Sequence, residues 1–298
     1  MKFLSALISS LAILSTSSPA QETNLIADGA KPEVLSEGYS FTEGPAVDKE
    51  GNVYFTDQPN DRIVKFTAAD GSFTDWLKPA GRSNGTYFDK DGNLLTCADE
   101  KNELWSIAPD KKITVLAKDL NGKLLNGPND LWIRPDGNFY FTDPFYKRGY
   151  WTRDKEMQQP GEYVYFYDIK SKKITPVATD LKQPNGIIGT PDGKTLYVAD
   201  IGARKTYSYS VKADGSLENK TLFCELGSDG MTIDAEGNVY LTGSGVTVFD
   251  KTGMKLTNTT IPEPWTANVT FGGKDRQLLF ITSSKKVYGL KMRVKGAY

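Results

Sequence analysis

The chain has 298 residues, a formal net charge of −1 and a pI of about 5.8, with 24% charged and 39% hydrophobic residues. Because the 36 Lys and Arg are interspersed with 37 Asp and Glu, no basic stripe indicates nucleic-acid binding, and the balance is typical of a globular protein. There is no histidine. This excludes Ser-His-Asp triads, Cys-His pairs and most zinc sites, so catalysis must use carboxylates, lysine, tyrosine or a metal.

The first element is an apolar, serine-rich run from Phe3 to Leu14, which follows Lys2 and precedes the small residues Ser18 and Ala20. This order is typical of a secretory signal peptide, and the run is shorter than the roughly 20 apolar residues of a membrane-spanning helix. We therefore expect residues 1–20 to be a signal peptide and residues 21–298 to form one exported domain. That domain is predicted to be periplasmic or secreted, with no membrane attachment after cleavage.

The rest of the chain repeats one pattern, in which Glu, Asn or Asp precedes an acidic-Gly turn and a strand-forming segment. The copies are EGPAVDKEG (43–51), NGTYFDKDG (84–92), NDLWIRPDG (129–137), NGIIGTPDG (185–193), DGMTIDAEG (229–237) and the degenerate NVTFGGKDR (268–276). One or two copies would indicate generic hairpins, but six in one phase with a period of about 45 residues are typical of propeller blades. The sequence therefore predicts an all-β fold, a six-bladed β-propeller.

The two cysteines, Cys97 and Cys224, fall in different repeats and lack metal-ligand spacing. In an exported protein they could form a disulfide or remain thiols. Their places in separate blades favour two unpaired, buried thiols.

The repeat starts are predicted to form a ring, because the innermost strand of every blade lines a central channel. The ring members are Glu43, Asn84, Asn129, Asn185, Asp229 and Asn268. Carboxylates and amides that converge on an enclosed channel are costly to desolvate unless a partner satisfies them. One divalent cation would do so, and oxygen ligands without histidine or cysteine favour Ca²⁺, with Mg²⁺, Mn²⁺ or Zn²⁺ as alternatives.

The third repeat is the longest and contains the irregular segment DPFYKRGYWTRDKEMQQPGEY (143–163). It is predicted to be either a rim loop over the channel mouth or a surface excursion packed on the neighbouring blade. In the first case Tyr146, Arg148 and Trp151 would face a substrate. Arg82 could meet an anionic or hydroxyl-rich ligand, and Asn84 and Asn268 are also expected to line the site.

Four phrases, EGPAVD, NGPNDLWIRPDGNFYFTDPFY, QPNGIIGTPDGKTLYVAD and SDGMTIDAEGNVYLT, resemble the gluconolactonase family that includes regucalcin (SMP-30). A more distant likeness is to squid diisopropyl fluorophosphatase, and the resemblance covers most of residues 40–296. It implies a six-bladed propeller with one catalytic divalent metal. The implied ligands are Glu43, Asn129, Asn185 and Asp229. Regucalcin-like members carry an arginine where this chain has Gly127, and bacterial members often a histidine where it has Arg134, which leaves the substrate open.

The predicted function is a metal-dependent hydrolase that opens sugar lactones, with the metal polarising the ester carbonyl and Asp229 as general base. Direct nucleophilic attack by Asp229 is the variant. Two alternatives stay open: a non-catalytic, calcium-stabilised propeller that binds a protein or glycan, and a related esterase or organophosphatase. The expected partner is a small-molecule substrate, and the expected state is a monomer or weak dimer.

Overall fold

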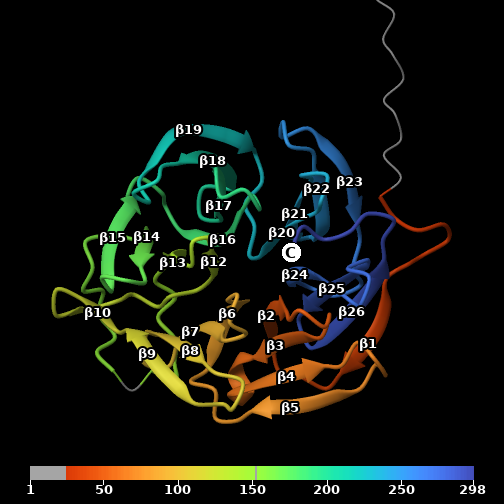
Figure 1. Ribbon diagram of the computed structural model, residues 1–298, viewed down its shortest axis with the longest axis horizontal. Helices are drawn as coiled ribbons and strands as arrows, with labels where there is room; N and C mark the ends of the chain where they lie inside the picture. Colours follow the sequence, from red (N-terminus) through yellow and green to blue (C-terminus); the bar gives the residue numbers. More distant parts are fainter. Residues whose placement is uncertain (1–24, 152) are drawn as a thin grey trace, which may run out of the picture.

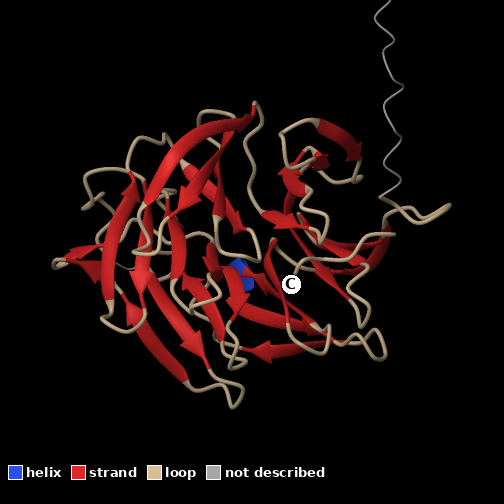
Figure 2. Ribbon diagram, turned by 45° about the horizontal axis from the view of Figure 1, so that its top comes forward, coloured by secondary structure: helices blue, strands red, loops and turns tan. Residues whose placement is uncertain are grey.

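Six four-stranded antiparallel sheets stand around a central axis in the computed structural model, which describes residues 25–151 and 153–298 (Figure 1). This confirms the predicted six-bladed β-propeller. The 3-10 helix η1 (Gln58–Asn60) is the one helical element of the described residues (Figure 2). No helix in these ranges is long and apolar enough to cross a membrane. The predicted signal peptide, residues 1–20, lies outside the described residues.

Each blade runs from an inner to an outer strand. The first blade contains β2 (Thr42–Val47), β3 (Val53–Asp57), β4 (Arg62–Phe66) and β5 (Phe73–Leu77). The second contains β6 (Ser83–Phe88), β7 (Leu94–Ala98), β8 (Glu103–Ile107) and β9 (Ile113–Ala117). The third contains β12 (Leu131–Ile133), β13 (Phe139–Asp143), β14 (Tyr163–Asp168) and β15 (Lys173–Ala178). The fourth blade contains β16 (Pro184–Gly189), β17 (Thr195–Asp200), β18 (Lys205–Val211) and β19 (Leu217–Cys224). The fifth contains β20 (Met231–Ile233), β21 (Val239–Gly243), β22 (Gly245–Phe249) and β23 (Lys255–Thr259). A small hairpin of β10 (Asp119–Leu120) and β11 (Lys123–Leu124) lies between the second and third blades in the chain.

The last blade joins the two ends of the propeller. Its inner three strands are β24 (Thr266–Gly272), β25 (Leu278–Ser283) and β26 (Lys286–Lys291), and its outer strand is β1 (Glu33–Glu37). β1 pairs antiparallel with β26, with Glu33 opposite Gly289 and Glu37 opposite Lys286. The ring of blades is therefore closed by hydrogen bonds between the first and last strands.

Inner strands turn back through the predicted acidic-Gly turns. In the first blade the Asp48 carboxylate accepts hydrogen bonds from the backbone N–H groups of Glu50 and Asn52 at 3.0 and 2.9 Å. An aspartate that binds its own turn in this way fixes a tight connection between two strands. This turn therefore joins the inner strand β2 tightly to β3.

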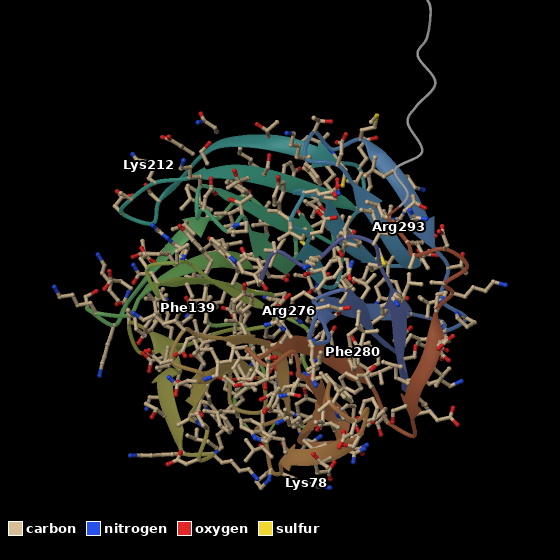
Figure 3. All side chains as sticks on the ribbon, turned by 45° about the vertical axis from the view of Figure 1, so that its right-hand side comes forward. Lys78, Phe139, Lys212, Arg276, Phe280 and Arg293 are labelled. Atoms are coloured by element: carbon tan, nitrogen blue, oxygen red, sulfur yellow. The ribbon has the colours of Figure 1, made fainter. Side chains whose placement is uncertain are left out.

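Aromatic and aliphatic side chains fill the space between neighbouring blades. Phe139 and Phe280, labelled in Figure 3, are fully buried in two of these layers. Phe139 stacks on Tyr167 with ring centroids 4.7 Å apart. Each such layer removes apolar surface from water on both sides, which is the main stabilising contribution to a fold of stacked sheets.

Cys97 and Cys224 are both free and buried, which confirms the prediction of unpaired thiols. Burial raises the pKa of both thiols. Neither is therefore expected to be reactive.

Candidate metal and substrate site

The six ring residues meet at one end of the central channel. A pocket of about 230 Å³ opens there, lined by Glu43, Asn84, Asn129 and Asp229 together with Phe41, Tyr146, Arg148, Ile201 and Trp265. The two other ring residues bind the carboxylates of this pocket. Asn185 Nδ2 donates to Asp229 Oδ1 at 2.8 Å, and Asn268 Nδ2 donates to Glu43 Oε2 at 3.2 Å. The predicted ring is thus present as a contiguous polar cluster.

Glycines directly after ring residues allow this close approach. A Cβ atom on Gly44 would lie 2.0 Å from the backbone oxygen of Asn84, and one on Gly230 would lie 1.9 Å from Cγ of Asn268. Any larger residue would push the next ring member outward. The Glu-Gly, Asn-Gly and Asp-Gly pairs of the repeat therefore set the width of the ring.

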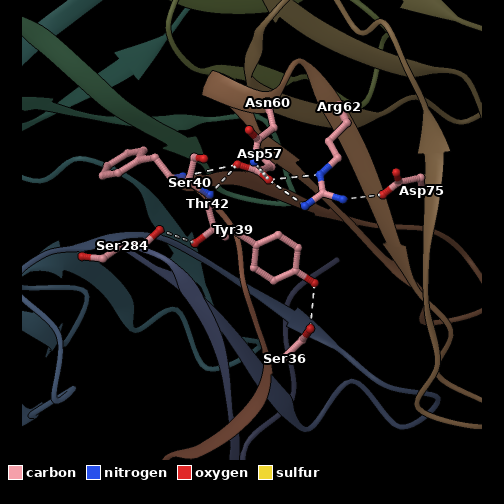
Figure 4. A network of polar contacts seen from close by, with 10 residues as sticks. Ser36, Tyr39, Ser40, Thr42, Asp57, Asn60, Arg62, Asp75 and Ser284 are labelled. Carbon is pink, nitrogen blue, oxygen red and sulfur yellow. Dashed lines mark hydrogen bonds and ion pairs between the residues drawn. The ribbon is translucent and has the colours of Figure 1, made fainter.

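Three predicted ligands are placed by one device, an aspartate at the end of the second strand of the blade. Its carboxylate accepts hydrogen bonds from the N–H groups three and two residues before the ligand, as Figure 4 shows for the segment that leads to Glu43. The sets are Asp57 with Ser40 and Phe41 (3.0 and 3.3 Å), Asp143 with Asn126 and Gly127 (2.9 and 2.8 Å), and Asp200 with Lys182 and Gln183 (2.8 and 2.9 Å). The backbone that carries Glu43, Asn129 and Asn185 is therefore held before any ligand binds.

The carboxylates of the site are electrostatically unfavourable neighbours. Burial raises the pKa of Glu43 well above its ordinary value, and the nearby charge of Asp229 raises it further. Burial also raises the pKa of Asp229, although hydrogen bonds from Trp265 and Asn185 act in the opposite direction. Asp130, beside Asn129, does not line this pocket, and burial raises its pKa to about 8. A cation bound near Glu43 and Asp229 would remove the repulsion between them.

The donor set fits a hard divalent cation. The buried Oδ1 atoms of Asn84 and Asn185 have no hydrogen-bond partner, and unpaired buried amide oxygens are suitable ligands for such an ion. Two carboxylates, Glu43 and Asp229, supply the balancing charge. Among the described residues no three His, Cys, Asp or Glu side chains form a metal cluster, so metal binding here depends on the amides.

The predicted substrate residues separate into two groups. Tyr146 and Arg148 line the pocket, and the Tyr146 hydroxyl accepts a hydrogen bond from Asn185 Nδ2 at 2.7 Å. Trp151 is only 2% exposed and does not line the pocket. Arg82 also lies outside it, where its guanidinium donates to the backbone oxygen of Pro59 at 2.8 Å.

The rim loop, described at residues 144–151 and 153–162 between β13 and β14, combines both alternatives left open by the sequence. Its start reaches the channel mouth through Tyr146 and Arg148, whereas Trp151 packs against the second blade by donating to Asp99. Gly127 leaves room for this packing, because a Cβ there would lie 3.0 Å from Asp99 Oδ1 and 3.3 Å from the Trp151 ring. The other departure from the family pattern, Arg134, does not line the pocket and pairs with Asp136 at 3.1 Å.

Sequence reasoning missed three pocket residues. Trp265, three residues before Asn268, donates from Nε1 to Asp229 Oδ2 at 2.6 Å. Phe41 and Ile201 form apolar walls. Phe41 and Trp265 directly precede inner strands at the ring end, which is the signal that could have found them.

A second, smaller cavity lies further along the channel and is lined by both apolar and polar side chains, Asp130 and Asn268 among them. This cavity of about 150 Å³ lies along the inner strands and is bounded by the C-terminal residue Tyr298, in line with the central position of the C-terminus in Figure 1. The Tyr298 hydroxyl donates to the backbone oxygen of Gly189, the last residue of β16, at 2.6 Å. It accepts a hydrogen bond from Trp132 Nε1 at 2.9 Å. The terminal residues therefore plug the channel.

Comparison with known proteins agrees with this fold. The sequence profile of the SMP-30/Gluconolactonase/LRE-like region matches residues 41–285, and the chain belongs to this family. It is 28% identical to a gluconolactonase of Zymomonas mobilis, over 91% of this chain and 84% of that protein. It is 27% identical to the diisopropyl-fluorophosphatase of Loligo vulgaris, over 71% and 74% of the two chains. The solved structure of a gluconolactonase from Xanthomonas campestris superimposes with a TM-score of 0.84 at 26% identity, covering 92% of this chain and 93% of that one.

Proposed function

We propose that this protein is a lactone hydrolase that acts on sugar lactones and uses one bound divalent metal ion. The observation that carries the proposal is the pair Glu43 and Asp229 on a pocket with unpartnered amide oxygens. Relatives named gluconolactonase and lactonase support a lactone-hydrolysing enzyme.

Glu43, Asn129, Asn185 and Asp229 would hold the ion, and their oxygen donors favour calcium. When bound, such an ion supplies positive charge that polarises the lactone carbonyl and stabilises the developing oxyanion. A structural metal needs no open position, whereas Glu43, Asn129 and Asp229 line a pocket in which a substrate would reach the ion.

Asp229 is the proposed general base. Trp265 and Asn185 each donate to one of its oxygens, so the orientation of the carboxylate is fixed. Asp229 takes a proton from the attacking water while the water oxygen bonds to the carbonyl carbon. The ring C–O bond then breaks, and the proton passes to the leaving alkoxide.

Arg148 and Tyr146 are proposed to bind the substrate. The guanidinium of Arg148 lies over the Tyr146 ring, 4.8 Å from its centroid, and both side chains line the pocket. A guanidinium can donate to hydroxyl or carboxylate oxygens of a sugar lactone. The neighbouring aromatic ring offers an apolar face.

The test is a pH-stat assay with glucono-1,5-lactone, because lactone opening releases an acid. We expect acid release above the spontaneous rate that stops when a chelator is added and returns when calcium is restored. Glu43→Ala should behave like the chelated protein, while Asp180→Asn, at an exposed surface ion pair, is the matched control. A panel of lactones, aryl esters and fluorophosphates without chelator-sensitive turnover would favour the non-catalytic scaffold.

A further inference from the structure

Asp99 occupies the place in the second blade that Asp57, Asp143 and Asp200 occupy in theirs, but it does not hold the backbone before a ring residue. That task belongs to Asp61, whose Oδ1 accepts from the N–H groups of Ala80 and Arg82 at 2.9 and 2.7 Å. The carboxylate of Asp99 is therefore available for another role.

The partners of Asp99 come mainly from the rim loop. Trp151 Nε1 donates to Oδ1 at 3.2 Å, the Tyr150 hydroxyl donates to Oδ2, and Arg148 Nε lies 3.4 Å from Oδ2. Gln58 Nε2 adds a hydrogen bond to Oδ2 at 3.3 Å. Asp99 is only 4% exposed, so these are charge-assisted contacts shielded from water.

Two arginines complete the packing around this carboxylate. The guanidinium of Arg82 lies 4.5 Å from the Tyr150 ring centroid, and that of Arg153 lies 3.6 Å from the Trp151 ring centroid. Both contacts have the geometry of cation–π interactions. The middle of the rim loop is thus fixed to the second blade through Asp99 and its neighbours.

Arg148 connects this anchor to the pocket. Its Nε edge faces Asp99 and its side chain lines the pocket, so its terminal nitrogens remain to donate to a substrate. Of the described residues, none accepts a hydrogen bond from these terminal nitrogens. The position of the Arg148 guanidinium in the pocket therefore depends on Asp99.

We propose that Asp99 is a positioning residue, which anchors the rim loop and so places Arg148 and Tyr146 to select lactones with hydroxyl or anionic substituents. The inference rests on the proposed lactone hydrolysis, which it deepens. Asp99 itself touches neither the proposed ligands nor the substrate pocket.

The kinetic test compares Asp99→Asn with Tyr150→Phe in the calcium-loaded protein. Asp99→Asn removes the negative charge that pairs with Arg148 and weakens the hydrogen bonds from Tyr150 and Trp151. KM for glucono-1,5-lactone should therefore rise about tenfold, with kcat changed less than about twofold. Tyr150→Phe removes one donor and should raise KM less. The double variant should be no worse than Asp99→Asn alone, because both changes remove the same contact.

A second readout needs no lactonase activity. Lys147, Arg148, Arg153 and Lys155 make the rim loop a trypsin substrate. Cleavage there should be faster in Asp99→Asn than in wild type, while calcium affinity and the Asp180→Asn control remain unchanged. Wild-type KM together with a wild-type cleavage rate would overturn the anchor, as would loss of calcium binding in Asp99→Asn. An inactive wild type would overturn the proposed function alone, since the cleavage rate would still decide the role of Asp99.

Discussion

The two ends of the central channel are built from the same six inner strands but differ in how their polar groups are satisfied. At the ring end, Glu43 and Asp229 line one pocket, the charge of Asp229 raises the pKa of Glu43, and two amide oxygens have no partner. At the other end, the cavity has a mixed apolar and polar lining, and the Tyr298 hydroxyl has both a donor and an acceptor. The carboxylate pair and the unpartnered amide oxygens thus lie at the ring end, where a ligand can relieve them, whereas the Tyr298 hydroxyl is satisfied within the protein and contributes stability.

Among substitutions at the ring end, the largest effect on activity is expected at Asp229. Asp229→Asn should lower kcat by about 100-fold or more, because the general base is lost while one side-chain oxygen remains for the metal. Calcium binding, measured by titration calorimetry, should largely persist. Full activity of this variant would remove Asp229 from the mechanism.

Glu43 tests whether repulsion at the ring end is relieved by a cation. For wild type, calcium at about 100 times its dissociation constant should stabilise the fold by about 2.7 kcal/mol and raise Tm. Glu43→Gln should abolish this shift, yet the metal-free variant should be more stable than metal-free wild type, because one buried charge is removed. Thermal unfolding with and without calcium measures both effects, and a variant that keeps the full calcium shift would contradict the assignment.

Tyr298 tests the other end. Tyr298→Phe leaves the Trp132 indole N–H without its acceptor and should lower the free energy of unfolding by about 1–2 kcal/mol. The change should leave kcat and calcium affinity unaltered, since Tyr298 contacts the far ends of the inner strands. Urea unfolding and the pH-stat assay distinguish the two outcomes. A loss of activity without a loss of stability would show that the ends are coupled.

Substitution of Trp265, which also lies at the ring end, is expected to have the smallest effect of the four. Trp265→Phe removes the N–H group that donates to Asp229 and should reduce kcat by about tenfold. Tm should shift little, because the side chain is 37% exposed. The same substitution at Trp76, an aromatic neighbour of Tyr54 away from the pocket, is the matched control and should not affect kcat.

The sequence was sufficient for the blades and the ring, because both follow from one repeat that keeps its phase. It was insufficient where blades differ in their use of the same motif. Asp99 follows a second strand just as Asp57 does, and only the presence of Asp61 and of the rim loop gives it other partners. Tyr298 could not be anticipated, because it belongs to no repeat and acts through residues more than 100 positions away in the chain.

The pairing of β1 with β26 has a consequence for when the protein becomes competent. During synthesis β1 cannot take its place in the last blade until β26 has been made, so the ring of blades stays open until then. Because the proposed metal ligands come from blades on different sides of the axis, a chain that ends before β26 should lack both the β1–β26 pairing and calcium binding. Calcium affinity is therefore expected to report whether the ring of blades has closed.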